Sequence, residues 1–170
     1  MTTLGGNIRA IEVEGTFDDC QALVKQALVD PDILAVRSVT TANSMNVGRL
    51  LPQIVYYLWG ISQMARDPQT SGGPPTIVVP SGNFGNLTAG AYAKRMGAPI
   101  RRLVAATNAN DVVPQYLLTG TYAPRPSVRT LSNAMDVGNP SNLARLHTLY
   151  GDDVGRMRLA GVLRAVLAQR

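Results

Sequence analysis

The fold of this chain can be inferred from one stretch, Pro80-Ser81-Gly82-Asn83-Phe84-Gly85-Asn86-Leu87-Thr88-Ala89-Gly90. It follows an apolar run of β-forming residues, 76–79, and precedes a segment of helical character, 87–96. A strand that leads through a glycine-rich loop into a helix directs several backbone N–H groups toward one point, where the helix dipole also favours negative charge. The stretch therefore predicts a binding site for a phosphate group.

The residue types in this loop suit an anion. Gly82 and Gly85 permit close approach of the backbone to a ligand, and the hydroxyl and amide side chains add hydrogen-bonding groups. The loop matches neither the dinucleotide-binding fingerprint nor the P-loop, because it lacks the third glycine or the lysine that those motifs require. We expect the contacting residues to be those of the loop itself: Ser81, Gly82, Asn83, Phe84, Gly85 and Asn86.

The loop resembles the S-G-N-F-G-[ND] phosphate loop of threonine synthases, which are pyridoxal-phosphate (PLP) enzymes of fold type II, the tryptophan synthase beta-like group. Further stretches resemble the same family in the same order: 12–21, 43–53, 105–114 and 132–142. The resemblance extends from about residue 2 to about residue 158 and corresponds to the middle of the family's longer chain. It implies PLP as cofactor and, as the family's reaction, the conversion of O-phosphohomoserine and water to threonine and phosphate.

Apolar periodicity predicts alternating strands and helices along the chain. The expected strands are 8–13, 33–39, 76–79 and 100–105; the expected helices start at Thr16, 47, 87, 111, about 141 and 152. Such alternation favours a parallel sheet with right-handed crossovers. We predict an α/β fold, a three-layer αβα arrangement with an open, mostly parallel sheet. We place one domain over residues 1–158 and a helical extension over 159–170.

The segment 47–66 is apolar on almost every side, which is typical of a helix that is buried all round. We expect Tyr56, Tyr57 and Trp59 to be core residues, and the helix to pack under the sheet and against another domain or subunit. Because it offers water no polar face, we also expect the isolated chain to self-associate through this helix or to be only marginally stable.

The stretch 132–142 is too polar for a core element and too rich in hydrogen-bonding side chains for a simple linker. Asn133, Asp136 and Asn139 belong to it, and the sequence leaves their separate roles open. The preceding segment, 120–129, contains prolines and no periodicity, which predicts a loop. We therefore expect residues 132–142 to line a site.

Catalysis in this family needs a lysine that forms an imine with PLP and a group that contacts the ring nitrogen. The resemblance places both outside the matched segment. The lysines of this chain, Lys25 and Lys94, both have the setting of solvated surface residues. His147 is the single histidine and is expected to be structural, and no metal site is predicted. We therefore predict no catalytic residue here and no turnover by this chain alone.

The composition bears on location and partners. The formal net charge is +5, but the arginines are scattered apart from Arg101-Arg102 and a C-terminal group. No basic stripe is interleaved with aromatic residues, which argues against nucleic-acid binding. No apolar run is long enough to span a membrane. Cys20, the single cysteine, suits a reducing cytoplasm and is expected to be a packing residue on a helix. The expected partner is a small-molecule phosphate ligand.

Three functional classes remain open. The chain could be part of a threonine synthase, a stand-alone module that binds phosphate or PLP without turnover, or an interaction protein that docks a partner through the helix 47–66. A lysine-bearing PLP motif encoded upstream would favour the first.

Overall fold

The computed structural model describes residues 5–70, 72–151 and 164–167. The chain separates into two compact units, Met1–Val39 and Thr40–Arg170. The first contains helices α1 and α2, and the second contains the sheet and the remaining helices. The α/β class and the parallel sheet are confirmed, while the domain boundary at residue 158 stays a prediction.

Helix α1, Phe17–Ala27, begins where the sequence predicted. Thr16 forms a capping box: its hydroxyl accepts a hydrogen bond from the Asp19 N–H at 3.3 Å, and the Asp19 carboxylate accepts one from the Thr16 N–H at 2.7 Å. These bonds, from the backbone and the side chain of Thr16, lower the pKa of Asp19. Cys20, expected to be a packing residue, is half-buried, whereas Leu23 on the same helix is 52% exposed.

Two strands expected in this unit are not formed. Residues 33–39 were expected to be a strand, but helix α2, Pro31–Val36, occupies most of that segment. Asp30 caps α2 through the N–H groups of Asp32 and Ile33, and Pro31 stands at its first turn, so capping outweighs β propensity. Residues 8–13 have no regular structure, and no described strand pairs with them.

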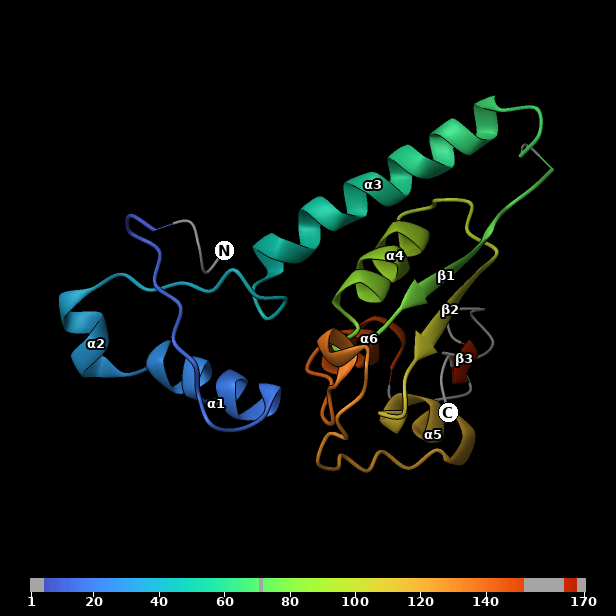
Figure 1. Ribbon diagram of the computed structural model, residues 1–170. Coiled ribbons are helices and arrows are strands. Elements are labelled where there is room, and N and C mark those ends of the chain that lie inside the picture. Colours follow the sequence, from blue (N-terminus) through green and yellow to red (C-terminus); the bar gives the residue numbers. More distant parts are fainter. Residues whose placement is uncertain (1–4, 71, 152–163, 168–170) are drawn as a thin grey trace. The chain divides into compact units, whose positions relative to one another are not determined.

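The second unit contains a parallel sheet of order β1-β2-β3, formed by Thr76–Pro80, Arg102–Thr107 and Arg164–Leu167 (Figure 1). The strands predicted at 76–79 and 100–105 are confirmed, the second with shifted ends. The helix predicted from 152, which includes the helical extension over 159–170, is wrong at 164–167, where the chain pairs with β2. Residues 152–163 and 168–170 lie outside the described part.

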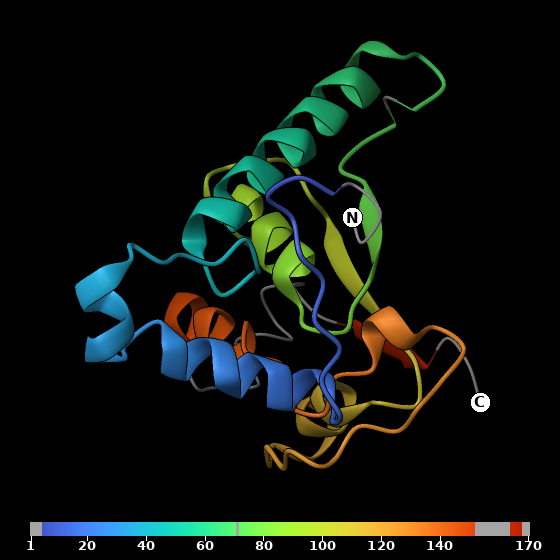
Figure 2. The same ribbon diagram turned by 60° about the vertical axis from the view of Figure 1, so that its left-hand side comes forward.

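Five helices complete the second unit in the described ranges: α3 (Val47–Arg66), α4 (Gly85–Arg95), α5 (Val112–Thr119), the 3-10 helix η1 (Asn133–Met135) and α6 (Leu143–Tyr150). Helix α4 is the crossover between β1 and β2, and α3 lies alongside it in both views (Figures 1 and 2). No helix of the described residues is long and apolar enough to cross a membrane.

Helix α3 has the predicted bounds, but it is not buried all round. A single stripe is buried, formed by residues spaced three or four apart: Leu50, Ile54, Tyr57 and Ile61. Trp59 is 65% exposed and Tyr56 is 49% exposed, so the expectation that they are core residues is wrong, whereas Tyr57 is confirmed at 6%. The reason is geometric: one face of α3 packs against α4, and the residues on its opposite face are exposed.

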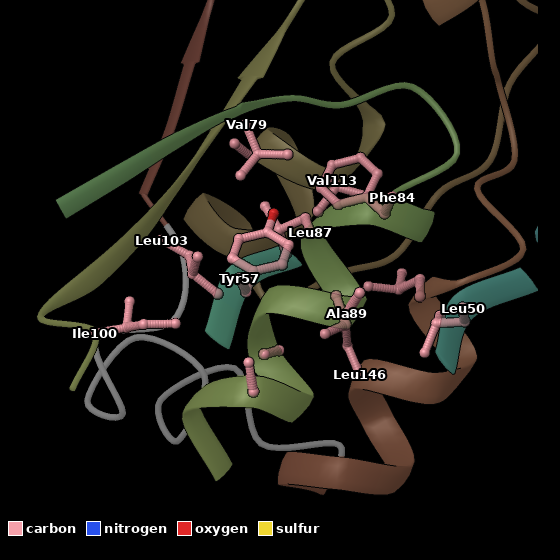
Figure 3. Packing of buried hydrophobic residues seen from close by; sticks show 14 of the residues in the cluster. Leu50, Tyr57, Val79, Phe84, Leu87, Ala89, Ile100, Leu103, Val113 and Leu146 are labelled. Carbon is pink, nitrogen blue, oxygen red and sulfur yellow. The ribbon is translucent and has the colours of Figure 1, made fainter. Parts of the chain in front are cut away.

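The core lies where α3 and α6 pack against α4 and where α4 packs against the sheet (Figure 3). Gly90 makes the close approach possible. A Cβ atom at Gly90 would stand 2.9 Å from the Tyr57 ring and 3.1 Å from Leu103 Cδ2. A side chain there would therefore separate α4 from both α3 and β2. Leu87 and Leu146 fill the same core and are fully buried.

Gly60 lies inside α3, and replacing it by alanine is expected to stabilise the chain by about 0.5–1 kcal/mol. Nothing lies within 4 Å of the Cβ that would be added, and the backbone there is helical, so the gain comes from reduced entropy of the unfolded chain. Urea unfolding measures the change. Gly73→Ala is the control, because its φ of +127° should make that substitution destabilising. A loss of stability in Gly60→Ala would contradict the open surface described for α3.

Candidate functional site

The loop 81–84 joins the carboxyl end of β1 to the first turn of α4. The Ser81 N–H donates to the Ala106 carbonyl at 2.8 Å, which ties the start of the loop to β2. Phe84 then adopts a left-handed conformation with φ 61°, which costs a non-glycine residue about 1–2 kcal/mol. Its side chain is only 3% exposed and packs in the core near Val113 (Figure 3). Burial of the phenyl ring therefore offsets the strain and directs the chain into α4.

The main-chain N–H groups of residues 82–87 make no hydrogen bond within the described part of the chain. Those of 85–87 belong to the first turn of α4, where N–H groups have no partner inside the helix and the dipole is positive. The arrangement fits a phosphate group, whose oxygens accept several hydrogen bonds and carry negative charge.

The side chains of the loop have other partners. Asn83 Nδ2 donates to Ser44 Oγ at 2.9 Å, and Asn83 Oδ1 accepts from the Ser141 N–H at 2.7 Å. Asn142 Nδ2 donates to both Ser44 Oγ, at 3.0 Å, and the Asn83 carbonyl, at 2.9 Å. Ser81 Oγ donates to the Val79 carbonyl at 2.8 Å. These side chains shape the loop, so the groups left for an anion are its main-chain N–H groups.

Arg145 on α6 fastens the same region. Its guanidinium donates to the carbonyls of Ser44, at 3.0 Å, and Met45, at 2.6 Å, and also contacts Asn142. Sequence reasoning missed Arg145, since nothing near it in the chain distinguishes it from other surface arginines. Its partners lie about a hundred positions earlier, and only the fold brings them together.

Asn86 connects the start of α4 to α3. Its Oδ1 accepts a hydrogen bond from the Tyr57 hydroxyl at 2.6 Å, and its Nδ2 donates to Gln53 Oε1 at 3.2 Å. Burial, with a smaller contribution from Tyr56, raises the pKa of Tyr57, so its hydroxyl stays protonated and remains a donor. The first turn of α4 is thereby held in a fixed position along α3.

The glycines of the loop allow close packing of other segments. A Cβ atom on Gly82 would stand 2.6 Å from the Met135 Cα, and one on Gly85 would stand 2.9 Å from the Ser44 Cβ. Sequence reasoning assigned both glycines to the approach of a ligand. The structure adds that each also admits a neighbouring segment of the protein. Direct contact of the six loop residues with a ligand stays a prediction.

The polar segment 132–142 reaches the loop through Met135. Asp136 holds it in place: its Oδ1 accepts from Asn108 Nδ2 and from Thr130 Oγ1, each at 2.7 Å, and its Oδ2 accepts from the Thr130 N–H at 2.9 Å. Asn108 stands just beyond the end of β2 and is 1% exposed. Asn139 Oδ1 accepts from the Tyr122 hydroxyl at 2.8 Å. The roles that the sequence left open are therefore structural for Asp136 and Asn139.

Asp136→Asn is expected to lower the free energy of unfolding by roughly 1–2 kcal/mol at pH 7. Both carboxylate oxygens accept hydrogen bonds, and the amide NH₂ group would replace one of these acceptors by a donor that faces another donor. Burial opposes ionisation of Asp136, but hydrogen bonds from Thr130 and Asn108 and the charge of Arg129 outweigh it and lower the pKa. The carboxylate thus stabilises the fold above its ordinary pKa of about 3.9, and this contribution is lost as the pH falls through the lowered value. Urea unfolding from pH 7 to 3 should show the difference from wild type shrinking with acidity. A difference that is constant with pH would contradict the role of the charge.

Lys94 lies at the end of α4 opposite the phosphate loop, and Lys25 belongs to the first unit. Lys94 is near the far end of α4, about 13 Å along the axis from Gly85, and its Nζ donates to the Arg101 carbonyl at 2.9 Å. Partial burial, together with the charge of Arg102, lowers the pKa of Lys94. Lys25 is exposed on α1. His147 lies on α6 with its ring 5.5 Å from that of Tyr116.

Comparison with known proteins gives a consistent result. Residues 1–167 match the family described as pyridoxal-phosphate dependent enzyme. The chain is 48% identical to the threonine synthase of Serratia marcescens and 45% identical to that of Escherichia coli K12, each over 159 residues, or 94% of this chain and 36% of the relative. It therefore spans little more than a third of the length of these relatives.

Solved structures agree with the sequence comparison. The crystal structure of the Escherichia coli threonine synthase superposes with a TM-score of 0.84 at 44% identity, covering 98% of this chain and 38% of the other. A PLP-bound threonine synthase from Brucella melitensis superposes with a TM-score of 0.74 at 32% identity, covering 98% of this chain and 40% of the other.

Proposed function

Since the chain belongs to the family of pyridoxal-phosphate-dependent enzymes, we propose that it binds the phosphate group of PLP at the N-terminus of α4. The proposal rests on one observation: the described residues provide no hydrogen-bond acceptor for the main-chain N–H groups of residues 82–87. Charge-assisted hydrogen bonds to an anion are stronger than neutral ones, and the helix dipole adds to them.

We further propose that this chain supplies the cofactor-phosphate site of a threonine synthase, an enzyme that converts O-phosphohomoserine and water to threonine and phosphate. The similarity to threonine synthases of two bacteria, at 45% and 48% identity, supports this choice within the family. PLP, when bound, supplies an electron sink for chemistry at the α-carbon of an amino acid.

In that reaction, residues of this chain would bind the phosphate group of the cofactor and keep it oriented. The N–H groups of 85–87 would hold the phosphate, and Asn83, Ser44 and Asn142 keep the loop in the shape that directs those groups to one point. Their hydrogen bonds hold the loop from two other segments of the chain, at Ser44 and at 141–142.

The test is a titration of the isotopically labelled chain with inorganic phosphate and with PLP, followed by amide NMR. We expect the N–H resonances of residues 82–87 to shift most. The matched control is the N-terminus of α3, where Asn46 Oδ1 already accepts from the Gly48 N–H at 2.8 Å. Shifts confined to other residues would refute the site.

A second function, a module that binds phosphate or PLP without turnover, is favoured by one observation. Lys94 is the single lysine in residues 40–170, and it lies at the end of α4 opposite the phosphate loop, so it is not placed to form an imine with PLP bound at that loop. The two functions predict the same binding and differ in phosphate release from substrate.

We also propose that two copies of the chain associate through the outward face of α3. That face carries large apolar side chains that are at least a third exposed: Val47, Leu51, Val55, Tyr56, Leu58 and Trp59. Contiguous apolar surface of this kind is typical of an interface. A cytoplasmic location, proposed from the single cysteine, is compatible with this assembly.

Trp59→Gln is expected to shift the chain from a dimer toward a monomer in sedimentation experiments, because Trp59 is a large aromatic residue that is 65% exposed on this face. Large aromatic residues often contribute most to an interface. Leu131→Gln is the control, since Leu131 is 99% exposed on a loop away from α3. A wild-type chain that sediments as a monomer at all concentrations would refute the dimer.

A further inference from the structure

Thr107 has a buried hydroxyl whose hydrogen-bonding capacity is unused. The residue is 0% exposed at the carboxyl end of β2, and its Oγ1 has no hydrogen-bond partner among the described residues. Buried polar groups in native proteins are nearly always paired, and leaving one unpaired costs stability. An exception next to a candidate site indicates a group that pairs when a ligand is present.

The direction of this side chain follows from the strand. Alternate residues of a strand share a face, so Thr107 lies on the same face as Leu103 and Ala105, which are both fully buried. Helix α4 covers that face, since a Cβ on Gly90 would stand 3.1 Å from Leu103 Cδ2. Thr107 therefore faces the layer that contains α4.

Thr107 also lies at the level of the loop. Helix α4 runs antiparallel to the strands that it connects, so its N-terminus points toward the end of β2. From Gly90 back to Gly85 the helix advances about 7 Å, whereas from Leu103 to Thr107 the strand advances about 13 Å. Thr107 is thus placed just beyond the first turn of α4, where the loop 81–84 lies. The 2.8 Å bond from the Ser81 N–H to the Ala106 carbonyl confirms that the loop starts beside it.

We propose that the Thr107 hydroxyl donates a hydrogen bond to the phosphate group bound at the N-terminus of α4. This inference rests on the proposed function and adds a side-chain donor to the main-chain N–H groups of 85–87. A phosphate monoester offers enough acceptor oxygens for all of these donors. Among the described residues the hydroxyl has no partner, and it gains one from the ligand.

The experiment compares wild type, Thr107→Val and Thr107→Ser. Isothermal calorimetry measures binding of inorganic phosphate and, separately, of PLP, and urea unfolding without ligand measures stability. Valine keeps the shape and removes the hydroxyl, so we expect roughly 10- to 100-fold weaker binding of both ligands, the usual worth of a hydrogen bond to a charged group. Serine keeps the hydroxyl and should retain most of the affinity.

The stability measurement separates this role from a structural one. Because the hydroxyl makes no bond inside the described chain, Thr107→Val should unfold at the same urea concentration as wild type or a higher one. Three outcomes would each overturn the inference while wild-type binding still supported the site. They are unchanged phosphate binding in Thr107→Val, equal losses of affinity in the valine and serine variants, and a lower unfolding midpoint for the valine variant. A wild-type chain that binds neither ligand would instead refute the proposed function.

Discussion

Gly82→Ala is expected to lower the free energy of unfolding by about 3 kcal/mol, the upper end of the usual cost of overpacking. The added Cβ would stand 2.6 Å from the Met135 Cα and 3.0 Å from its carbonyl oxygen. Main-chain atoms cannot rotate away as a side chain does, so either the loop or η1 must move. Asp136 anchors η1 through its bonds to Asn108 and Thr130, which leaves the loop as the part that gives way.

Phosphate binding should fall with stability in this variant, because the displaced loop no longer directs the N–H groups of 85–87 to one point. Urea unfolding and phosphate calorimetry measure the two effects on the same samples. The matched control is Gly72→Ala, where nothing lies within 4 Å of the added Cβ. A Gly82→Ala chain with the stability and affinity of the Gly72→Ala chain would contradict the packing of the loop against Met135.

The 170-residue chain, incubated with PLP and O-phosphohomoserine, is expected to release no phosphate through turnover. PLP enzymes need a lysine amine bonded to the cofactor, and a positioned base is typically worth roughly 10²- to 10⁴-fold in rate. Lys94 is tied to the Arg101 carbonyl at 2.9 Å near the end of α4 opposite the phosphate loop. Lys25 is exposed on α1.

A phosphate-release assay and mass spectrometry after borohydride reduction test this prediction together. Lys25→Ala and Lys94→Ala are the controls that assign any labelled lysine, and a full-length threonine synthase is the positive control. Multiple turnovers that accompany stoichiometric labelling of either lysine would show that the chain is a complete catalyst. Binding of PLP without labelling or turnover is the expected outcome.

The elements that were predicted correctly have strong local signals. Helix α3 has the bounds expected from its composition, and Asn46 caps it by accepting from the Gly48 N–H. The strand, loop and helix around Gly82 and Gly85 are also in place. The failures lie where the local signal is short. At 33–39 the cap at Asp30 produced a helix, and at 164–167 a partner strand produced β3 from a helical pattern.

The glycine-rich turn, its helix and the family to which they belong follow from residues that are neighbours in the chain. That Ser44, Asn83, Asn142 and Arg145 meet at this turn, and that Trp59 is exposed while Tyr57 is buried, became known from the folded structure. Hydrogen bonds between distant segments and the burial of one helix face depend on which elements pack together. Local propensity and periodicity do not contain that information.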